Sequence, residues 1–262
     1  MGSASKLRSR LSWLAIAGVL AGGGGAVMAA LTNQQVDHLA IDIVVRVLTG
    51  WTWLGVGIFA WWRRPDNAFG KWMVFTSFAW MAQFLTFANS ALVFTFGLVI
   101  AYVFPISLVQ TLVRFPTGRI ESRMDRWVLR LVAVALGLVI VALLFTTSEH
   151  YGYEGAPRNL MMLTDSFTTV TVLTIVANAI AISLVLVLIH SFTTKYSVAS
   201  PPMRRLIGPV LWTSTTLLAL LGVASVFSIA NLEGAEQFVG FAGALNAMAL
   251  PIAFLIGLGR SR

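Results

Sequence analysis

Seven polar side chains stand inside long apolar stretches of the chain, where intramembrane chemistry would have to take place. Asp42 and Arg46 are four residues apart, so in a helix they share one face and can form an ion pair. We expect a structural pair at a helix interface, with a ligand or proton site as the alternative. The others are single amides, which either form interhelical hydrogen bonds or line one ligand cavity together. They are Gln83, Asn89, Gln110, Asn178 and Asn246.

Residue types that hold metals or form covalent intermediates are scarce. The chain has no cysteine, and of its three histidines His38 and His150 lie in polar connections. His190 has no second histidine or carboxylate three or four residues away. We therefore expect no metal and no bound cofactor. The motifs HExxH, GxSxG and GxxxxGK[ST] are also missing, so we expect no enzymatic activity on this chain.

The composition is that of a membrane protein. Hydrophobic residues make up 58% of the chain and charged residues 11%, too few to cover a water-soluble globule of 262 residues. A formal net charge of +8 would suggest nucleic acid as the partner of a soluble protein. In a membrane protein, such charge collects on cytoplasmic loops and faces lipid head groups, so we expect membrane lipids and no nucleic acid as partners.

Eight apolar segments of about 20 residues, the length that a helix needs to cross a hydrocarbon core, divide the chain. We expect an all-α integral membrane protein: one polytopic domain, built as a bundle of about eight transmembrane helices. The third and fourth segments are so close that they could instead form one re-entrant unit. The predicted segments are 11–31, 40–62, 72–90, 94–113, 127–146, 169–192, 206–229 and 238–258.

The basic residues predict the orientation of this bundle. If the N-terminus is cytoplasmic, all of the 18 Lys and Arg residues except Arg46 and Arg158 fall on the cytoplasmic side. We therefore expect cytoplasmic N- and C-termini and a multi-pass protein of the bacterial plasma membrane. The first segment is long enough to be a retained helix, with a cleaved signal peptide as the alternative. Its glycine run, residues 22–25, favours close approach of another helix.

Two polar loops carry proline and glycine at fixed spacings. An R-R-P-x-N-x-x-G pattern follows the second segment, at Arg63, Arg64, Pro65, Asn67 and Gly70. An L-x-x-F-P-x-G-R pattern follows the fourth, at Leu112, Phe115, Pro116, Gly118 and Arg119. Together with the ending "ALPIAFLIGLGRSR", these loops resemble the N-terminal multi-span sensor region of actinobacterial two-component histidine kinases. The likeness covers roughly residues 61–126.

The resemblance implies a membrane-embedded sensor that relays a signal through its last helix. It implies a homodimer or a cytoplasmic signalling partner; the kinase catalytic domains of such proteins would lie outside these 262 residues. The ligand is not indicated, and input could enter through the amides or through the external loop, 148–168. In that loop we expect "NLMML", residues 159–163, to lie as a short helix on the membrane surface. The alternatives are a small transporter or channel-like protein and an accessory subunit of a membrane complex.

Overall fold

The computed structural model describes residues 2–36, 38–115, 117–120, 122–146, 154–230 and 233–259. In these ranges the chain is helical, with one isolated β-bridge between Gln35 and Glu154. The elements are α1 (Gly2–Ala30), α2 (Leu39–Arg63), α3 (Ala68–Met81), η1 (Ala82–Phe87), α4 (Ala91–Ala101), α5 (Val103–Arg114), α6 (Arg123–Ala142), η2 (Leu143–Phe145), α7 (Phe167–Val198), α8 (Pro201–Ile229) and α9 (Glu233–Gly259).

Six helical segments of the described chain are long and apolar enough to cross a membrane. The apolar part of α9, Ala242–Ile256, is shorter, and α3 reaches the length of a span only together with η1. The predicted all-α fold is confirmed for the described residues, and its long apolar helices are compatible with a multi-pass membrane protein. The six segments are Ser5–Ala30, Leu39–Arg63, Ala91–Arg114, Arg123–Phe145, Phe167–Val198 and Ile207–Ala224.

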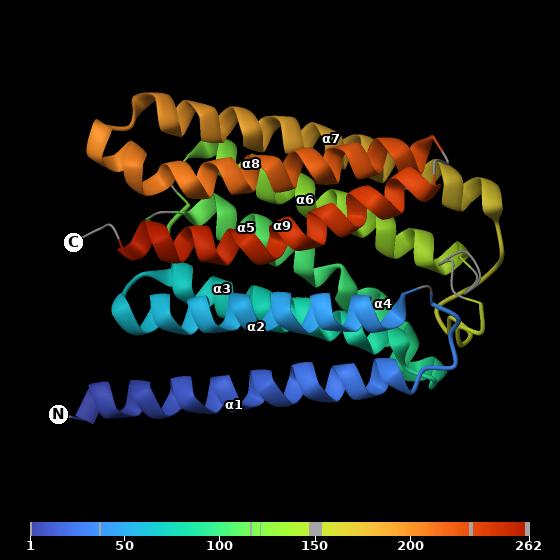
Figure 1. Ribbon diagram of the computed structural model, residues 1–262. Helices are drawn as coiled ribbons and strands as arrows, with labels where there is room; N and C mark the ends of the chain where they lie inside the picture. Colours follow the sequence, from blue (N-terminus) through green and yellow to red (C-terminus); the bar gives the residue numbers. More distant parts are fainter. Residues whose placement is uncertain are drawn as a thin grey trace.

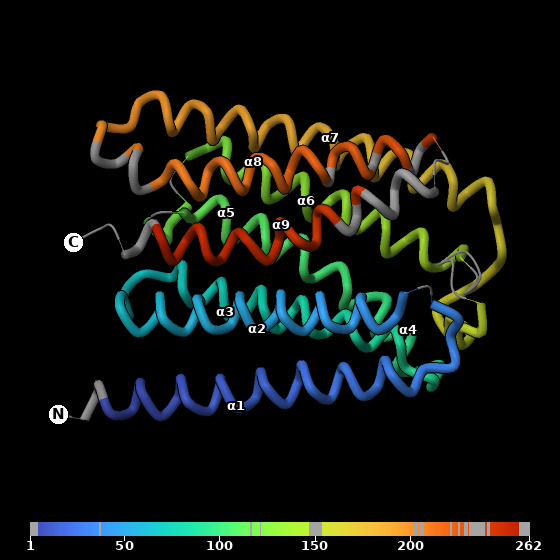
Figure 2. Tube along the Cα trace, in the orientation of Figure 1, coloured from blue at the N-terminus to red at the C-terminus, as the bar shows by residue number. Residues whose placement is uncertain are grey.

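The helices form a closed ring in which consecutive helices run antiparallel and the closing pair, α9 and α2, runs parallel (Figure 1). Each of α2, α3, α5, α6, α7, α8 and α9 contacts the next in that order, and α9 returns to α2. Helix α1 lies outside the ring against α2 and η1, while α4 packs on η1. The start of α1 and the end of α9 lie at the same end of the bundle, as the trace in Figure 2 also shows.

The core joins the second helix to the last one. Trp53 of α2 and Phe254 of α9 are both fully buried, with ring centroids 6.2 Å apart. The indole nitrogen of Trp53 donates to the backbone oxygen of Ala247, also on α9, at 2.9 Å. This bond satisfies the polar atom of a side chain that is otherwise surrounded by apolar groups.

Two glycines of α1 fit it closely against its neighbours. A Cβ on Gly22 would lie 2.5 Å from the indole nitrogen of Trp51, and one on Gly25 would lie 2.4 Å from the ring of Phe84. The predicted close approach is therefore found at these two positions. No atom lies within 4 Å of a Cβ built at Gly23 or Gly24, so the other half of the glycine run faces away.

Several helix ends differ from the predicted segments because caps and turns decide them. Helix α3 begins at Ala68, before the predicted 72, since the Asn67 side chain accepts from the backbone N–H of Phe69 at 2.8 Å. The predicted segment 94–113 is interrupted at Tyr102, where α4 ends and α5 begins. The third and fourth segments are separate elements, because α3 with η1 packs along α5 and α4, joined by residues 88–90.

The predicted surface helix at 159–163 is wrong. These residues form turns, and Asn159 is buried with its side-chain amide donating to the backbone oxygens of Leu143 (2.8 Å) and Thr146 (3.0 Å). The loop therefore closes the end of η2, whose last carbonyls have no partner within the helix. Residues 148–153 of the predicted external loop, His150 included, lie outside the described residues.

Candidate functional site

The predicted ion pair is present at the end of the bundle opposite the two chain ends. The guanidinium of Arg46 contacts the Asp42 carboxylate at 2.7 Å and donates to the side-chain oxygen of Gln83 at 3.3 Å. It also lies 5.3 Å from the ring centroid of Phe87. The indole of Trp80 donates to the backbone oxygen of Arg46 at 2.8 Å. These contacts tie α2 to α3 and η1, which is the structural role expected for the pair.

Asn89 serves the same end of the bundle. Its amide donates to the backbone oxygen of Leu31 and accepts from the backbone N–H of Asn33, both at 2.8 Å. Beside it, Gln34 donates to the backbone oxygen of Thr86 at 2.8 Å. Four of the seven predicted polar residues thus gather here, and their partners are helices and turns of the chain itself.

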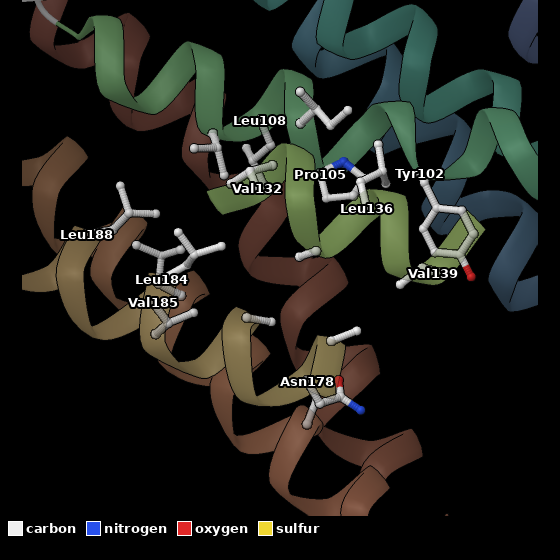
Figure 3. Close-up of a pocket in the computed structure, with 17 residues that line it drawn as sticks. Tyr102, Pro105, Leu108, Val132, Leu136, Val139, Asn178, Leu184, Val185 and Leu188 are labelled. Atoms are coloured by element: carbon white, nitrogen blue, oxygen red, sulfur yellow. The ribbon is translucent and has the colours of Figure 1, made fainter. Parts of the chain in front are cut away.

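The other three amides lie apart from this cluster and from one another. Gln110 accepts from the Arg114 guanidinium at the opposite end of the bundle. Asn246 has a buried side-chain oxygen with no hydrogen bond to a described residue. Asn178 lines an apolar cavity between α5, α6, α7 and α8 (Figure 3). The seven residues therefore do not converge on one site.

The two polar loops that carry the proline and glycine patterns, after α2 and after α5, contact each other. Gly118 has a positive φ of 78°, and a Cβ built there would lie 1.9 Å from the side-chain oxygen of Asn67. That oxygen is the one that caps α3. Gly70 lies against the end of α2, where a Cβ on residue 70 would come within 2.4 Å of the backbone nitrogen of Trp61. Both glycines are thus needed for close packing, while Pro116 lies outside the described residues.

An open basic hollow of about 550 Å³ lies between these loops. Three exposed guanidinium groups and one carboxylate surround it, so its charge is positive and suits an anionic lipid head group. The lining residues are Arg63, Arg64, Pro65, Asp66, Asn67, Thr117 and Arg119.

Aromatic packing connects both loops to the last helix. Phe69, within the first loop pattern, and Phe115, in the second, have ring centroids 5.4 Å apart. Phe254 of α9 packs against both, at 4.7 Å from Phe69 and 5.0 Å from Phe115. If either loop moves, it therefore pushes directly on the buried ring of Phe254 and so on α9.

Asp125 joins α6 to α7 at the same end of the bundle. With Ser122 it forms a capping box at the start of α6, and its carboxylate lies 3.6 Å from the Lys195 ammonium. Asp125 is 2% exposed, so its carboxylate is buried while it pairs with the charge of Lys195. The Ser-x-x-Asp spacing is a readable capping signal that the sequence prediction did not use. The role of Asn159 has no comparable signal, because the carbonyls that it binds lie 13 and 16 residues earlier in the chain, at the end of η2.

No cluster of three or more metal-binding side chains is found among the described residues. No protein family, curated protein or solved structure matches the chain.

Proposed function

We propose that this chain is a membrane-embedded signal-input domain of histidine-kinase type, in which α9 carries the output. In this proposal the chain crosses the bacterial plasma membrane eight times, with α3–η1 and α4–α5 as the third and fourth crossings. Both chain ends and the basic loops then face the cytoplasm, where anionic lipids meet the arginines. The chain acts as a homodimer or through a cytoplasmic partner, which supplies any catalysis.

The packing of Phe254 is the observation that carries this proposal. The ring is fully buried and contacts both loops that resemble the kinase sensor family, yet it belongs to the helix nearest to the C-terminus. Interlocked side chains move between discrete arrangements, so a change in either loop shifts or rotates the end of α9. Such a movement is what a coiled dimerisation helix downstream would receive.

A chimera tests this proposal. The end of α9 is joined, in several helical registers, to the dimerisation and catalytic domains of a histidine kinase, and autophosphorylation is measured in vesicles. We expect Phe254→Leu, which keeps an apolar side chain but removes the ring contacts, to change kinase activity several-fold. The control Ile252→Leu lies on the same helix and is 48% exposed, so it leaves the activity unchanged. Equal activity of both variants in every register counts against the proposal.

One feature favours a transporter as the second candidate. The interrupted segment at Tyr102 borders the apolar cavity, and discontinuous helices next to a cavity are common in secondary transporters. Solute uptake into proteoliposomes, lost on substitution around Tyr102, would support this alternative over the sensor.

A further inference from the structure

An apolar cavity around Asn178 is explained by neither the ion pair nor the loops. It measures about 380 Å³, within the range of small-molecule sites. Figure 3 shows Pro105 and Leu108 of α5, Leu136 of α6 and Leu184 of α7 around it. Apolar clefts of this size with a few polar groups are typical of small-molecule sites, so the space is suited to an occupant.

A second cavity lies next to the first, inside the ring of helices. It measures about 190 Å³ and is bounded by α3, α5, α8 and α9. Leu108 and Ala224 line both cavities, so these two residues lie between them. Since leucine can change rotamer, the two cavities offer extended apolar space across the bundle.

The polar groups of the first cavity lie toward one end. Tyr102 and Asn178 are on the side away from Leu188 (Figure 3). Asn178 and Leu188 are ten residues apart on α7, a rise of about 15 Å. The side-chain amide of Asn178 makes no hydrogen bond to any described residue, and it can both donate and accept. The cavity is therefore long and apolar, with a hydrogen-bonding group at one end.

The lining contains no charged side chain, which defines the chemistry of the occupant. A charged head group would enter an apolar site with nothing to compensate it, at high cost. Pro105 on the rim is exposed on the surface of the bundle, so the cavity is reached from the side, where a bilayer would lie. An amphiphile that dissolves in the bilayer has access to such a rim.

We propose that this cavity binds a neutral lipophilic molecule with a single hydroxyl or carbonyl group, which hydrogen-bonds to Asn178. The hydrocarbon body lies along α7 toward Leu188, and Ala177 and Ala181 leave room for it. This site goes beyond the signalling proposal and does not depend on it, because binding is measured directly and not through any output.

Photocrosslinking of the full chain in nanodiscs tests the proposal. Three probes share a dodecyl chain that carries a diazirine and an alkyne: an alcohol, a plain alkane and a permanently charged trimethylammonium. We expect saturable labelling of α5–α8 peptides by the alcohol, with competition by unlabelled dodecanol and about tenfold weaker labelling by the ammonium. Asn178→Leu, which keeps the volume and removes the amide, lowers the affinity for the alcohol by up to about tenfold and leaves the alkane unchanged.

A matched pair of variants locates the labelling. Ala181→Phe fills the cavity, while Ala179→Phe adds the same ring at an exposed position two residues away. We expect labelling to be lost in the first and retained in the second, with circular dichroism showing that both are folded. If Ala181→Phe does not fold, the Asn178→Leu comparison decides alone. Non-saturable labelling, or equal affinity for the alcohol and the alkane in the unsubstituted chain, overturns the proposal.

Discussion

Replacing Gly118 by alanine tests the contact between the two loops. The residue has a φ of 78°, and an L-side chain in the left-handed region costs about 1–2 kcal/mol. The new Cβ would also lie 1.9 Å from the side-chain oxygen of Asn67, so that side chain has to move away from the N–H of Phe69. Losing an N-terminal cap costs about 1 kcal/mol. We therefore expect Gly118→Ala to lower the free energy of unfolding by about 2–3 kcal/mol.

Reversible unfolding in mixed micelles, titrated with dodecyl sulfate and followed by circular dichroism, measures this loss. Gly137→Ala is the matched control, because Gly137 is exposed on α6 and no atom lies within 4 Å of a Cβ built there. In a helix this change is neutral or stabilising by about 0.5–1 kcal/mol.

A double-mutant cycle separates strain from the clash with Asn67. Asn67→Ala alone removes the cap and costs about 1 kcal/mol. After Gly118→Ala the cap is already lost, so adding Asn67→Ala costs almost nothing, and the two residues show a coupling of about 1 kcal/mol. Strict additivity, or a Gly118→Ala variant as stable as Gly137→Ala, would refute the proposed contact.

Three further predictions concern the ends of the bundle. Asp125→Ala should lower the free energy of unfolding by about 1–2 kcal/mol through loss of the cap, whereas exposed Asp66→Ala stays within about 0.5 kcal/mol; equal effects would contradict the role of Asp125. Asn159→Ala, in the same titration, should cost about 1–3 kcal/mol because it leaves two buried carbonyls without a donor; a neutral result would exclude this closure. Since the chain has no cysteine, Thr117→Cys should react with a membrane-impermeant maleimide only in inverted vesicles, and Leu163→Cys, at a position 76% exposed, only in intact cells. The reverse labelling pattern would overturn the proposed orientation.

The length of the apolar segments was enough to locate the long helices, because a run of about 20 apolar residues is typical of a helix that crosses a membrane. It could not locate their ends. Helix α3 begins at the cap provided by Asn67, and α6 begins at the capping box of Ser122 and Asp125, both in polar stretches that a hydropathy window assigns to loops. The interruption at Tyr102 occurs within an apolar run, where hydropathy does not change.

The candidate site was predictable only where partners are close in sequence. Asp42 and Arg46 are one helical turn apart, so their pairing follows from spacing. The contact of Asn67 with Gly118 and that of Phe69 with Phe254 depend on how distant helices pack, which one sequence does not contain. The position of Asn178 in a cavity also depends on how distant helices pack, so it could not be predicted from the sequence.

The hydrogen bond between Trp53 and Ala247 has a consequence for biosynthesis. It joins residues 194 positions apart, and α9 fills the place between α2 and α8 that closes the ring. The ribosome therefore synthesises α2 long before α9, which holds the acceptor of the Trp53 indole. Until α9 is inserted, the indole N–H of Trp53 lies in the bilayer or beside the insertion machinery without this hydrogen bond. Chains that stop before α9 keep the ring open, so they present membrane proteases with a recognisable unfinished product.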